Sequence, residues 1–145
     1  MFERYTEKAR RALFFARYEA SEFGSHHIEP EHILLGLFRE DNALANRYLQ
    51  SCPGTESIRK QVEAHAPARA KIPGTVDLPL SHECKHLLDR VADEARRLSH
   101  DHIDTGHLLL GLLCEEKCFA AELLHERGLS ISQMRKDLED GGSYV

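Results

Sequence analysis

The chain has 145 residues, of which 41% are hydrophobic, and its formal net charge at pH 7 is −5. This length and composition suit one globular domain with its own core and exclude a disordered chain. The acidic balance argues against nucleic-acid binding, and no apolar run is long enough to predict a membrane-spanning helix. The charged N-terminus lacks the apolar stretch of a signal peptide, and the four cysteines form no CxxC pair. We therefore expect a cytoplasmic protein with reduced thiols.

Four helices are predicted in the first half of the chain. The first follows Thr6, which serves as its N-cap, and stops at Gly24. The second, over residues 31–39, is apolar on nearly every side, which predicts a buried central helix. Two shorter helices are predicted over residues 43–50 and 56–65.

The second half follows a stretch over residues 66–80 that contains three prolines and is predicted to be a linker. Ser81 is predicted to cap the next helix, and Thr105 to precede a second buried helix that ends near Cys114. Two further helices are predicted, over residues 118–127 and from Ser130 or Ser132 to about Asp140, before a loose tail over residues 141–145.

One stretch of the sequence occurs twice, because His27–Leu37 returns as His102–Leu112 at a spacing of 75 positions. Over residues 24–37 and 99–112, seven of fourteen positions are identical. Glycine in a helix costs about 1 kcal/mol relative to alanine. The recurrence of Gly36 as Gly111 within this stretch therefore suggests that a neighbouring helix approaches closely at both positions.

The same offset holds outside that stretch, where it aligns Thr6 with Ser81 and Glu19 with Glu94. We therefore predict an all-α fold of eight helices, built from repeat one (residues 1–65) and repeat two (residues 81–140). Each four-helix repeat alone would bury little, so the two should pack together about a pseudo-two-fold axis.

Three features together resemble the N-terminal domain of Clp-type AAA+ unfoldases, most closely the ClpC branch. They are Phe2-Glu3-Arg4-Tyr5-Thr6, the doubled His-Ile-x-x-x-His-[Ile/Leu]-Leu-Leu-Gly-Leu motif and the proline-containing linker. The resemblance covers the whole chain. It implies a module that receives protein substrates and adaptor proteins, passing them in a full-length member to ATPase rings and a partner peptidase. This chain has no GxxxxGK[ST] motif, and whether it acts alone or was cut from a longer protein stays open.

The resemblance also implies a phosphoarginine-binding site at helix starts, where a hydroxyl residue and a glutamate assist binding. The residues concerned are Thr6 and Glu31 in the first copy and Ser81 in the second. Carboxylates pair with guanidinium groups, and helix N-termini with phosphate. Pro30 stands where threonine is usual and Gly106 where glutamate is usual, so we expect the second site to be weakened. The alternative is that Thr6 and Ser81 serve only as N-caps.

Helical periodicity places Phe14, Phe15 and Tyr18 on the side of the first helix opposite its core face. Their counterparts in the second copy are Asp89, Arg90 and Asp93, which form an ordinary solvated face. The first copy therefore carries an extra apolar strip, which would suit docking of unfolded segments or adaptors. The alternative is that the linker or the other copy covers it.

In the family, this side of the first helix joins Phe2 in a peptide-accepting groove with a cation at the position of Lys85. The resemblance therefore implies a peptide- and adaptor-binding set, which consists of Phe2, Arg10, Phe14 and Lys85.

We predict no metal, cofactor or catalytic site. The histidine and cysteine spacings match no zinc motif, and we expect His32 and His107 to form hydrogen bonds at helix starts. No nucleophile motif such as GxSxG is present. The leading hypothesis is a substrate and adaptor receptor of the Clp system. The alternatives are a stand-alone regulator that docks on a Clp ATPase or peptidase and a metal- or redox-sensing helical protein.

Overall fold

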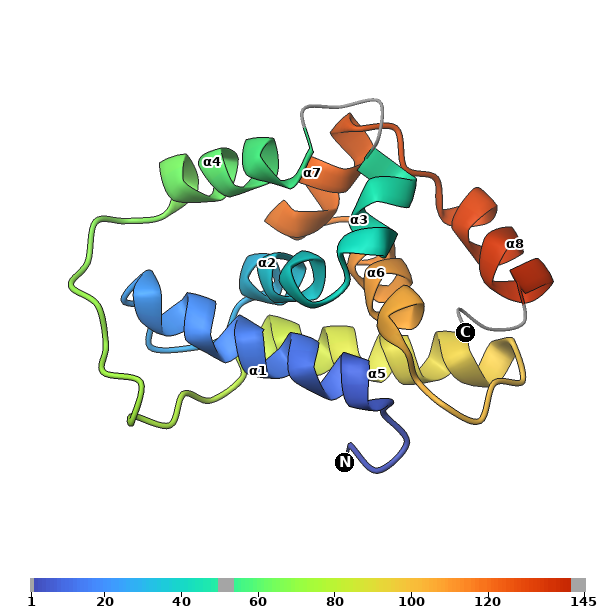
Figure 1. Cartoon of the computed structure of the whole chain (residues 1–145), viewed down its shortest axis with the longest axis horizontal. Helices are drawn as coiled ribbons and strands as arrows, with labels where there is room; N and C mark the ends of the chain where they lie inside the picture. Colours follow the sequence, from blue (N-terminus) through green and yellow to red (C-terminus); the bar gives the residue numbers. More distant parts are fainter. Residues whose placement is uncertain (1, 50–53, 142–145) are drawn as a thin grey trace.

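The computed structural model describes residues 2–49 and 54–141 and confirms the all-α fold (Figure 1). Within these ranges the chain forms eight helices, and its only extended pairing is two isolated β-bridges. The helices are α1 (Glu7–Glu22), α2 (Pro30–Glu40), α3 (Asn42–Leu49), α4 (Thr55–His65), α5 (His82–Arg97), α6 (Thr105–Cys114), α7 (Phe119–Glu126) and α8 (Ile131–Gly141). None of them is both long and apolar enough to cross a membrane.

Helices α2 and α6 lie at the centre, between the layer of α1 and α5 and the remaining four helices (Figure 1). Every residue of α6 is buried, as is each residue from His32 to Phe38 of α2. Leucine and isoleucine occupy most of these positions, so whichever side of the helix is considered, it must face protein rather than water. The prediction of a buried central helix in each repeat is confirmed.

Close approach at the two motif glycines is also confirmed. A Cβ atom on Gly36 would collide with the carbonyl oxygen of Ala12 and the backbone nitrogen of Ala16 in α1. Helix α1 permits this approach because Ala9, Ala12, Ala16 and Ala20 line its buried face. At Gly111 a Cβ would instead collide with the Val91 side chain of α5. In both repeats, glycine thus permits the second helix to cross the first closely. In repeat one the glycine faces backbone atoms of α1, and in repeat two it faces a side chain of α5.

The two repeats join through a pair of equivalent β-bridges, Tyr5 with Ile103 and Ile28 with Leu80. The Thr6 N–H donates to the Ile103 carbonyl at 2.9 Å, and the Ile28 N–H donates to the Pro79 carbonyl at 2.8 Å. Each bridge brings the start of one repeat's first helix beside the start of the other repeat's second helix. We call the first the α1/α6 junction and the second the α2/α5 junction.

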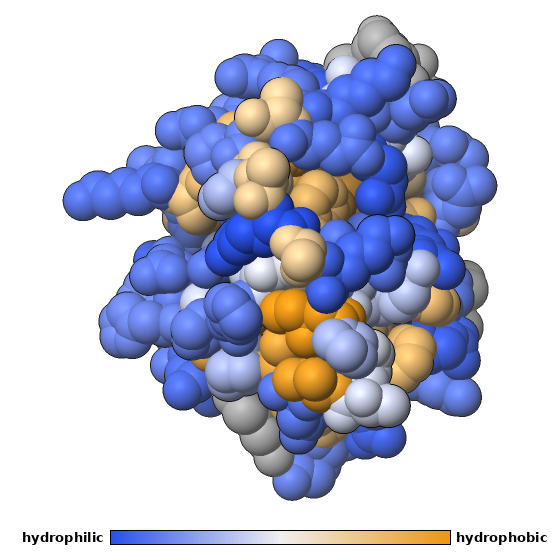
Figure 2. Space-filling view, turned by 90° about the vertical axis from the view of Figure 1, so that its left-hand side faces the viewer, coloured by the Kyte–Doolittle hydropathy of each residue, from blue (hydrophilic) through white to orange (hydrophobic). Residues whose placement is uncertain are grey.

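The linker packs along one side of α1. The Ile72 N–H donates to the Ser21 carbonyl at 2.9 Å, and the Arg17 guanidinium donates to the carbonyls of Gly74 and Val76 at 2.9 and 3.0 Å. Figure 2 views the molecule from this side, and strongly apolar atoms gather there in one patch among mostly hydrophilic residues. Val76 is 43% exposed, so the linker itself contributes apolar surface.

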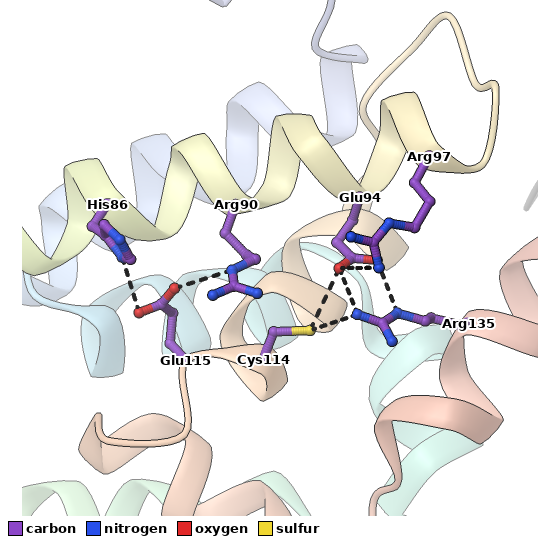
Figure 3. Close-up of polar contacts among 7 residues, drawn as sticks. All are labelled: His86, Arg90, Glu94, Arg97, Cys114, Glu115 and Arg135. Carbon is purple, nitrogen blue, oxygen red and sulfur yellow. Dashed lines mark hydrogen bonds and ion pairs between the residues drawn. The ribbon is translucent and has the colours of Figure 1, made fainter.

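An ion pair between a partly exposed arginine and a buried glutamate attaches the last helix of each repeat to the first. In repeat one, Arg59 of α4 binds both carboxylate oxygens of Glu19 at 3.0 and 2.6 Å. In repeat two, Arg135 of α8 binds both oxygens of Glu94 at 3.0 and 2.7 Å, beside the Cys114 thiol (Figure 3). Glu19 and Glu94 are 2% and 1% exposed, so their paired geometry offsets a large desolvation cost.

Three details correct or limit the sequence-based boundaries. Thr105 is the first residue of α6 rather than the residue before it, and Asp104 is the N-cap, since its carboxylate accepts the Thr105 N–H at 2.8 Å. Helix α7 begins at Phe119, and the Cys118 sulfur caps it by accepting the Ala121 N–H at 3.4 Å. The predicted tail lies outside the described residues except for Gly141, which ends α8.

Candidate functional site

At the α1/α6 junction, the Thr6 hydroxyl has two hydrogen-bond partners. It accepts the Ala9 N–H at 3.1 Å, which confirms the predicted N-cap, and it donates to the Asp104 carboxylate of repeat two at 2.9 Å. Gly106 is buried there and supplies no carboxylate. This junction therefore has a hydroxyl whose proton is already engaged, no glutamate at position 106, and a carboxylate, Asp104, that already accepts from the Thr6 hydroxyl and the Thr105 N–H.

At the α2/α5 junction, Ser81 caps α5 by accepting the Cys84 N–H at 3.1 Å. Glu31 lies in the first turn of α2, and burial raises the pKa of its carboxyl. A hollow of about 290 Å³ opens at this place. Its lining comprises Pro30, His82, Glu83, His86, Glu115, Lys117 and Cys118.

The structure thus divides the three predicted phosphoarginine-site residues by junction rather than by repeat. Thr6 lies with the start of α6, whereas Ser81 lies with the start of α2 that carries Glu31. Only the α2/α5 junction combines a hydroxyl cap with a partly buried glutamate.

The predicted peptide-binding set is spread over both first helices. Arg10 donates to the Phe2 and Glu3 carbonyls at 3.0 and 3.3 Å, and the Phe2 ring stands edge-on to the buried Tyr5 ring at 5.0 Å between centroids. Lys85 is exposed on α5 at the position equivalent to Arg10. Phe2 and Arg10 therefore lie together, while Lys85 occupies the matching place in the other repeat.

The aromatic strip of α1 faces solvent. Phe14 is 60% exposed and Tyr18 is 44% exposed, while Phe15 is half-buried. The Arg39 guanidinium of α2 lies over the Phe15 and Tyr18 rings, 4.6 and 4.9 Å from their centroids. The linker packs beside the strip through Arg17 but leaves Phe14 uncovered, so the alternative that the linker or the other repeat hides it is wrong for this residue.

The two motif histidines complete helix caps, as predicted. The His32 Nδ1 accepts the Glu29 N–H, and the His107 Nδ1 accepts the Asp104 N–H, both at 2.9 Å. Burial lowers the pKa of each imidazole to about 4. The two neutral rings therefore serve as hydrogen-bond acceptors that stabilise the starts of α2 and α6 at the two junctions.

The cysteine environments oppose thiolate chemistry at the described positions. Burial raises the pKa of Cys84, Cys114 and Cys118, whereas a reactive cysteine needs a lowered pKa. Among residues 2–49 and 54–141, no three His, Cys, Asp or Glu side chains converge as metal ligands would. Cys52 lies outside the described residues.

The side-chain contacts between different helices were not predicted from the sequence. The repeat offset had aligned Glu19 with Glu94, and Arg59 aligns with Arg135 at 76 positions, which was a signal for the two ion pairs. No pair of residues aligned by the repeat indicated the Thr6–Asp104 hydrogen bond or the stacking of Arg39 on the aromatic strip.

The sequence matches the family model of the Clp repeat (R) N-terminal domain over residues 4–127 and 88–140. The ClpC/MecB protein of Bacillus subtilis (strain 168), described as a negative regulator of genetic competence, is 37% identical over 139 residues, which are 95% of this chain. The chaperone protein ClpB of Oceanobacillus iheyensis is 36% identical over 138 residues, again 95% of this chain. The chain spans 17% of the length of each of these relatives.

Solved structures agree on the fold. The N-terminal domain of the chaperone ClpD from Arabidopsis thaliana superposes with a TM-score of 0.74 at 24% identity, covering 94% of this chain and 92% of that one. The Hsp104 N-terminal domain from Candida albicans gives a TM-score of 0.73 at 18% identity, covering 97% and 93%. At such identities these likenesses concern the fold alone.

Proposed function

The chain belongs to the family of Clp repeat N-terminal domains, and from that premise we propose that it is a receptor for protein substrates and adaptor proteins. Its role is recognition, while ATP-driven unfolding and peptide cleavage belong to an ATPase ring and a peptidase with which it works. The same proposal places it in the cytoplasm, where its thiols stay reduced.

The observation that carries this proposal is the exposed aromatic strip of α1. A phenylalanine that is 60% exposed contributes little to the core, and the equivalent position of repeat two holds Asp89 without harm to the fold. Exposed aromatic side chains are typical anchors of protein interfaces. Phe2 and Arg10, at the start of the same helix, extend the surface, and Lys85 offers a cation at the other junction.

The direct test is a titration of fluorescein-labelled casein, an unfolded client, against the whole chain by fluorescence anisotropy. We expect saturable binding and no binding of a labelled, stably folded protein. Failure to bind casein, combined with binding to a purified Clp ATPase ring or peptidase, would replace the receptor with a stand-alone regulator.

We also propose that any phosphoarginine binding occurs at the α2/α5 junction. The support is the combination there of Glu31, the Ser81-capped helix start and the hollow, set against a glycine and an engaged hydroxyl at the α1/α6 junction. In calorimetric titration with free phosphoarginine we expect one site, lost in Glu31→Gln and retained in Thr6→Ser. Two sites of equal affinity would contradict this assignment.

A further inference from the structure

The outward face of α1 has a definite arrangement of aromatic and cationic side chains. At about 100° per residue, Phe14 and Tyr18 lie along its middle line. Arg10 and Arg17 fall on one side of that line. Arg11 falls on the other side, where Arg39 reaches across from α2 to the Tyr18 ring. The aromatic ridge therefore runs between two rows of arginines.

Most of these arginines bind backbone carbonyls or have a carboxylate only near the outer limit of ion-pair distance. Arg10 and Arg17 bind backbone carbonyls, and the carboxylate of the fully exposed Asp77 lies 3.7 Å from the Arg17 guanidinium. Arg39 lies 3.8 Å from Glu19, whose two oxygens are already bound by Arg59. Such contacts fix the guanidinium groups in position but leave them available to an incoming carboxylate.

Of the four arginines, Arg11 is the exception. Its guanidinium binds Glu40 at 2.9 Å and Glu7 at 3.2 Å, so its charge is matched within the chain. The positive charge that is only loosely paired therefore lies at Arg10 and Arg17 on the linker side of the ridge and at Arg39 on its other side.

Repeat two shows that the fold does not require this arrangement. At the equivalent positions of α5, Asp89 and Asp93 replace Phe14 and Tyr18, and Ala92 replaces Arg17. Cys114 stands in α6 where α2 has Arg39. Because α5 folds and packs with these residues, the ridge, Arg17 and Arg39 are a property of the surface of repeat one, whereas Lys85 keeps a cation at the position of Arg10.

We propose that the outward face of α1 binds a partner segment that carries apolar anchor residues flanked by Asp or Glu, and that the equivalent face of α5 does not. The inference rests on the proposed receptor function and names the chemical class of its partner. The anchors would cover Phe14 and Tyr18, while the acidic side chains would pair with Arg10, Arg17 and Arg39.

The same charges disfavour a second copy of this chain as the occupant. A two-fold symmetric contact through α1 would place arginine rows against arginine rows. A second copy could dock only head to tail, by presenting the acidic positions 89 and 93 of its α5. That arrangement would make self-association dependent on concentration and on Phe14, which sedimentation can detect.

The test uses two labelled helical peptides of about sixteen residues that share apolar anchors spaced three and four apart. One carries Glu on both sides of the anchors and the other carries Lys. Against the whole chain we expect the acidic peptide to bind at least about tenfold more tightly than the basic one, with weakening at higher salt.

A variant locates the site on α1. Phe14→Asp, which introduces the residue found in repeat two, should weaken binding of the acidic peptide at least about tenfold. The matched control, Asp89→Asn, should leave its affinity within about twofold.

Each other result overturns the inference. Equal binding of the two peptides would contradict the acidic class, and unchanged affinity in Phe14→Asp would place the site elsewhere. If no peptide binds while casein does, the inference fails and the receptor function stands; if casein also fails to bind, both fail. Phe14-dependent self-association would make a second copy the occupant.

Amide NMR of the unaltered chain with the acidic peptide locates the binding site without a variant. We expect the perturbed signals to cluster on residues 10–18 and not on residues 85–93.

Discussion

Helices α1 and α5 hold equivalent places in the two repeats, and they share their N-caps and the ion pairs of their buried glutamates but not their outward faces. Thr6 and Ser81 cap them in the same way, and Glu19 and Glu94 accept equivalent arginines. On the outward side, an aromatic ridge in one corresponds to acidic residues in the other. Since both helices belong to one scaffold, the shared features show what packing demands, and the outward face of α1, which packing does not fix, is where we propose that binding occurs.

The largest effect of a single substitution should follow from breaking one of the ion pairs whose carboxylates are buried. Arg135→Leu leaves the Glu94 carboxylate buried with its bidentate partner gone, so we expect a loss of about 3 kcal/mol in unfolding free energy. Arg59→Leu in repeat one should cost a similar amount. Urea denaturation followed by circular dichroism measures both.

Replacing both partners is the control. Glu94→Leu combined with Arg135→Leu should recover much of the loss, because no uncompensated charge remains. If Arg135→Leu were neutral while Arg59→Leu was costly, the ion pairs of the two repeats would not be equivalent.

Acid should weaken both junctions through His32 and His107. Their folded pKa of about 4 lies below the usual 6.5, so the unfolded chain binds more protons between these values. Stability is therefore complete above pH 6.5 and declines as the pH falls toward 4, by roughly 2 kcal/mol per histidine at pH 5.

Urea denaturation at pH 7 and pH 5 tests this dependence, and His107→Gln should flatten it by about half. Protonated imidazole cannot accept the Glu29 or Asp104 N–H, which is the structural cause. Equal stability at the two pH values would show that these rings are not buried acceptors.

The two motif glycines should differ when each is changed to alanine. At Gly36 the added methyl meets the backbone of Ala12 and Ala16, which cannot move without shifting α1. At Gly111 it meets one methyl group of the Val91 side chain, which can yield by a turn about χ1 to a less favoured rotamer without moving the backbone of α5. Allowing for the gain in helix propensity, we expect a net loss of about 2 kcal/mol for Gly36→Ala and of less than about 1 kcal/mol for Gly111→Ala, measured by thermal unfolding. The reverse order would contradict the described crossings.

The smallest effect on stability is expected at the ridge itself. Phe14→Asp removes a largely exposed ring, so we expect the unfolding free energy to change by less than about 0.5 kcal/mol. Thermal unfolding of this variant beside Asp89→Phe checks that either face tolerates either residue. A large loss in Phe14→Asp would mean that the ring has a packing role.

The sequence allowed prediction of features that depend on local chemistry or on the internal repeat. Thr6 and Ser81 could be identified as caps because a hydroxyl precedes each helix, and the glycine crossings because the same residue recurs in a buried motif. The eight helices followed from periodicity, although the prediction put Thr105 before α6, whereas Thr105 is its first residue and Asp104 is its N-cap.

Contacts between distant segments could not be predicted in this way. The periodicity of α1 placed Phe14 and Tyr18 on its outward side but gave no information on what else lies there. Three contacts depend on how the helices cross. They are the packing of the linker against Arg17, the contact of Arg39 with the rings of α1 and the hydrogen bond between Thr6 and Asp104. The groove expected around Phe2 and Lys85 remains a prediction.

The central claim is that repeat one presents the receiving surface and repeat two does not. Its most direct test is amide NMR of the isotope-labelled chain titrated with unlabelled casein. We predict that perturbed signals concentrate in residues 2–18, around Phe14 and Tyr18, while the signals of Asp89 and Asp93 stay unchanged. Perturbations spread equally over α1 and α5, or confined to α5, would contradict the account.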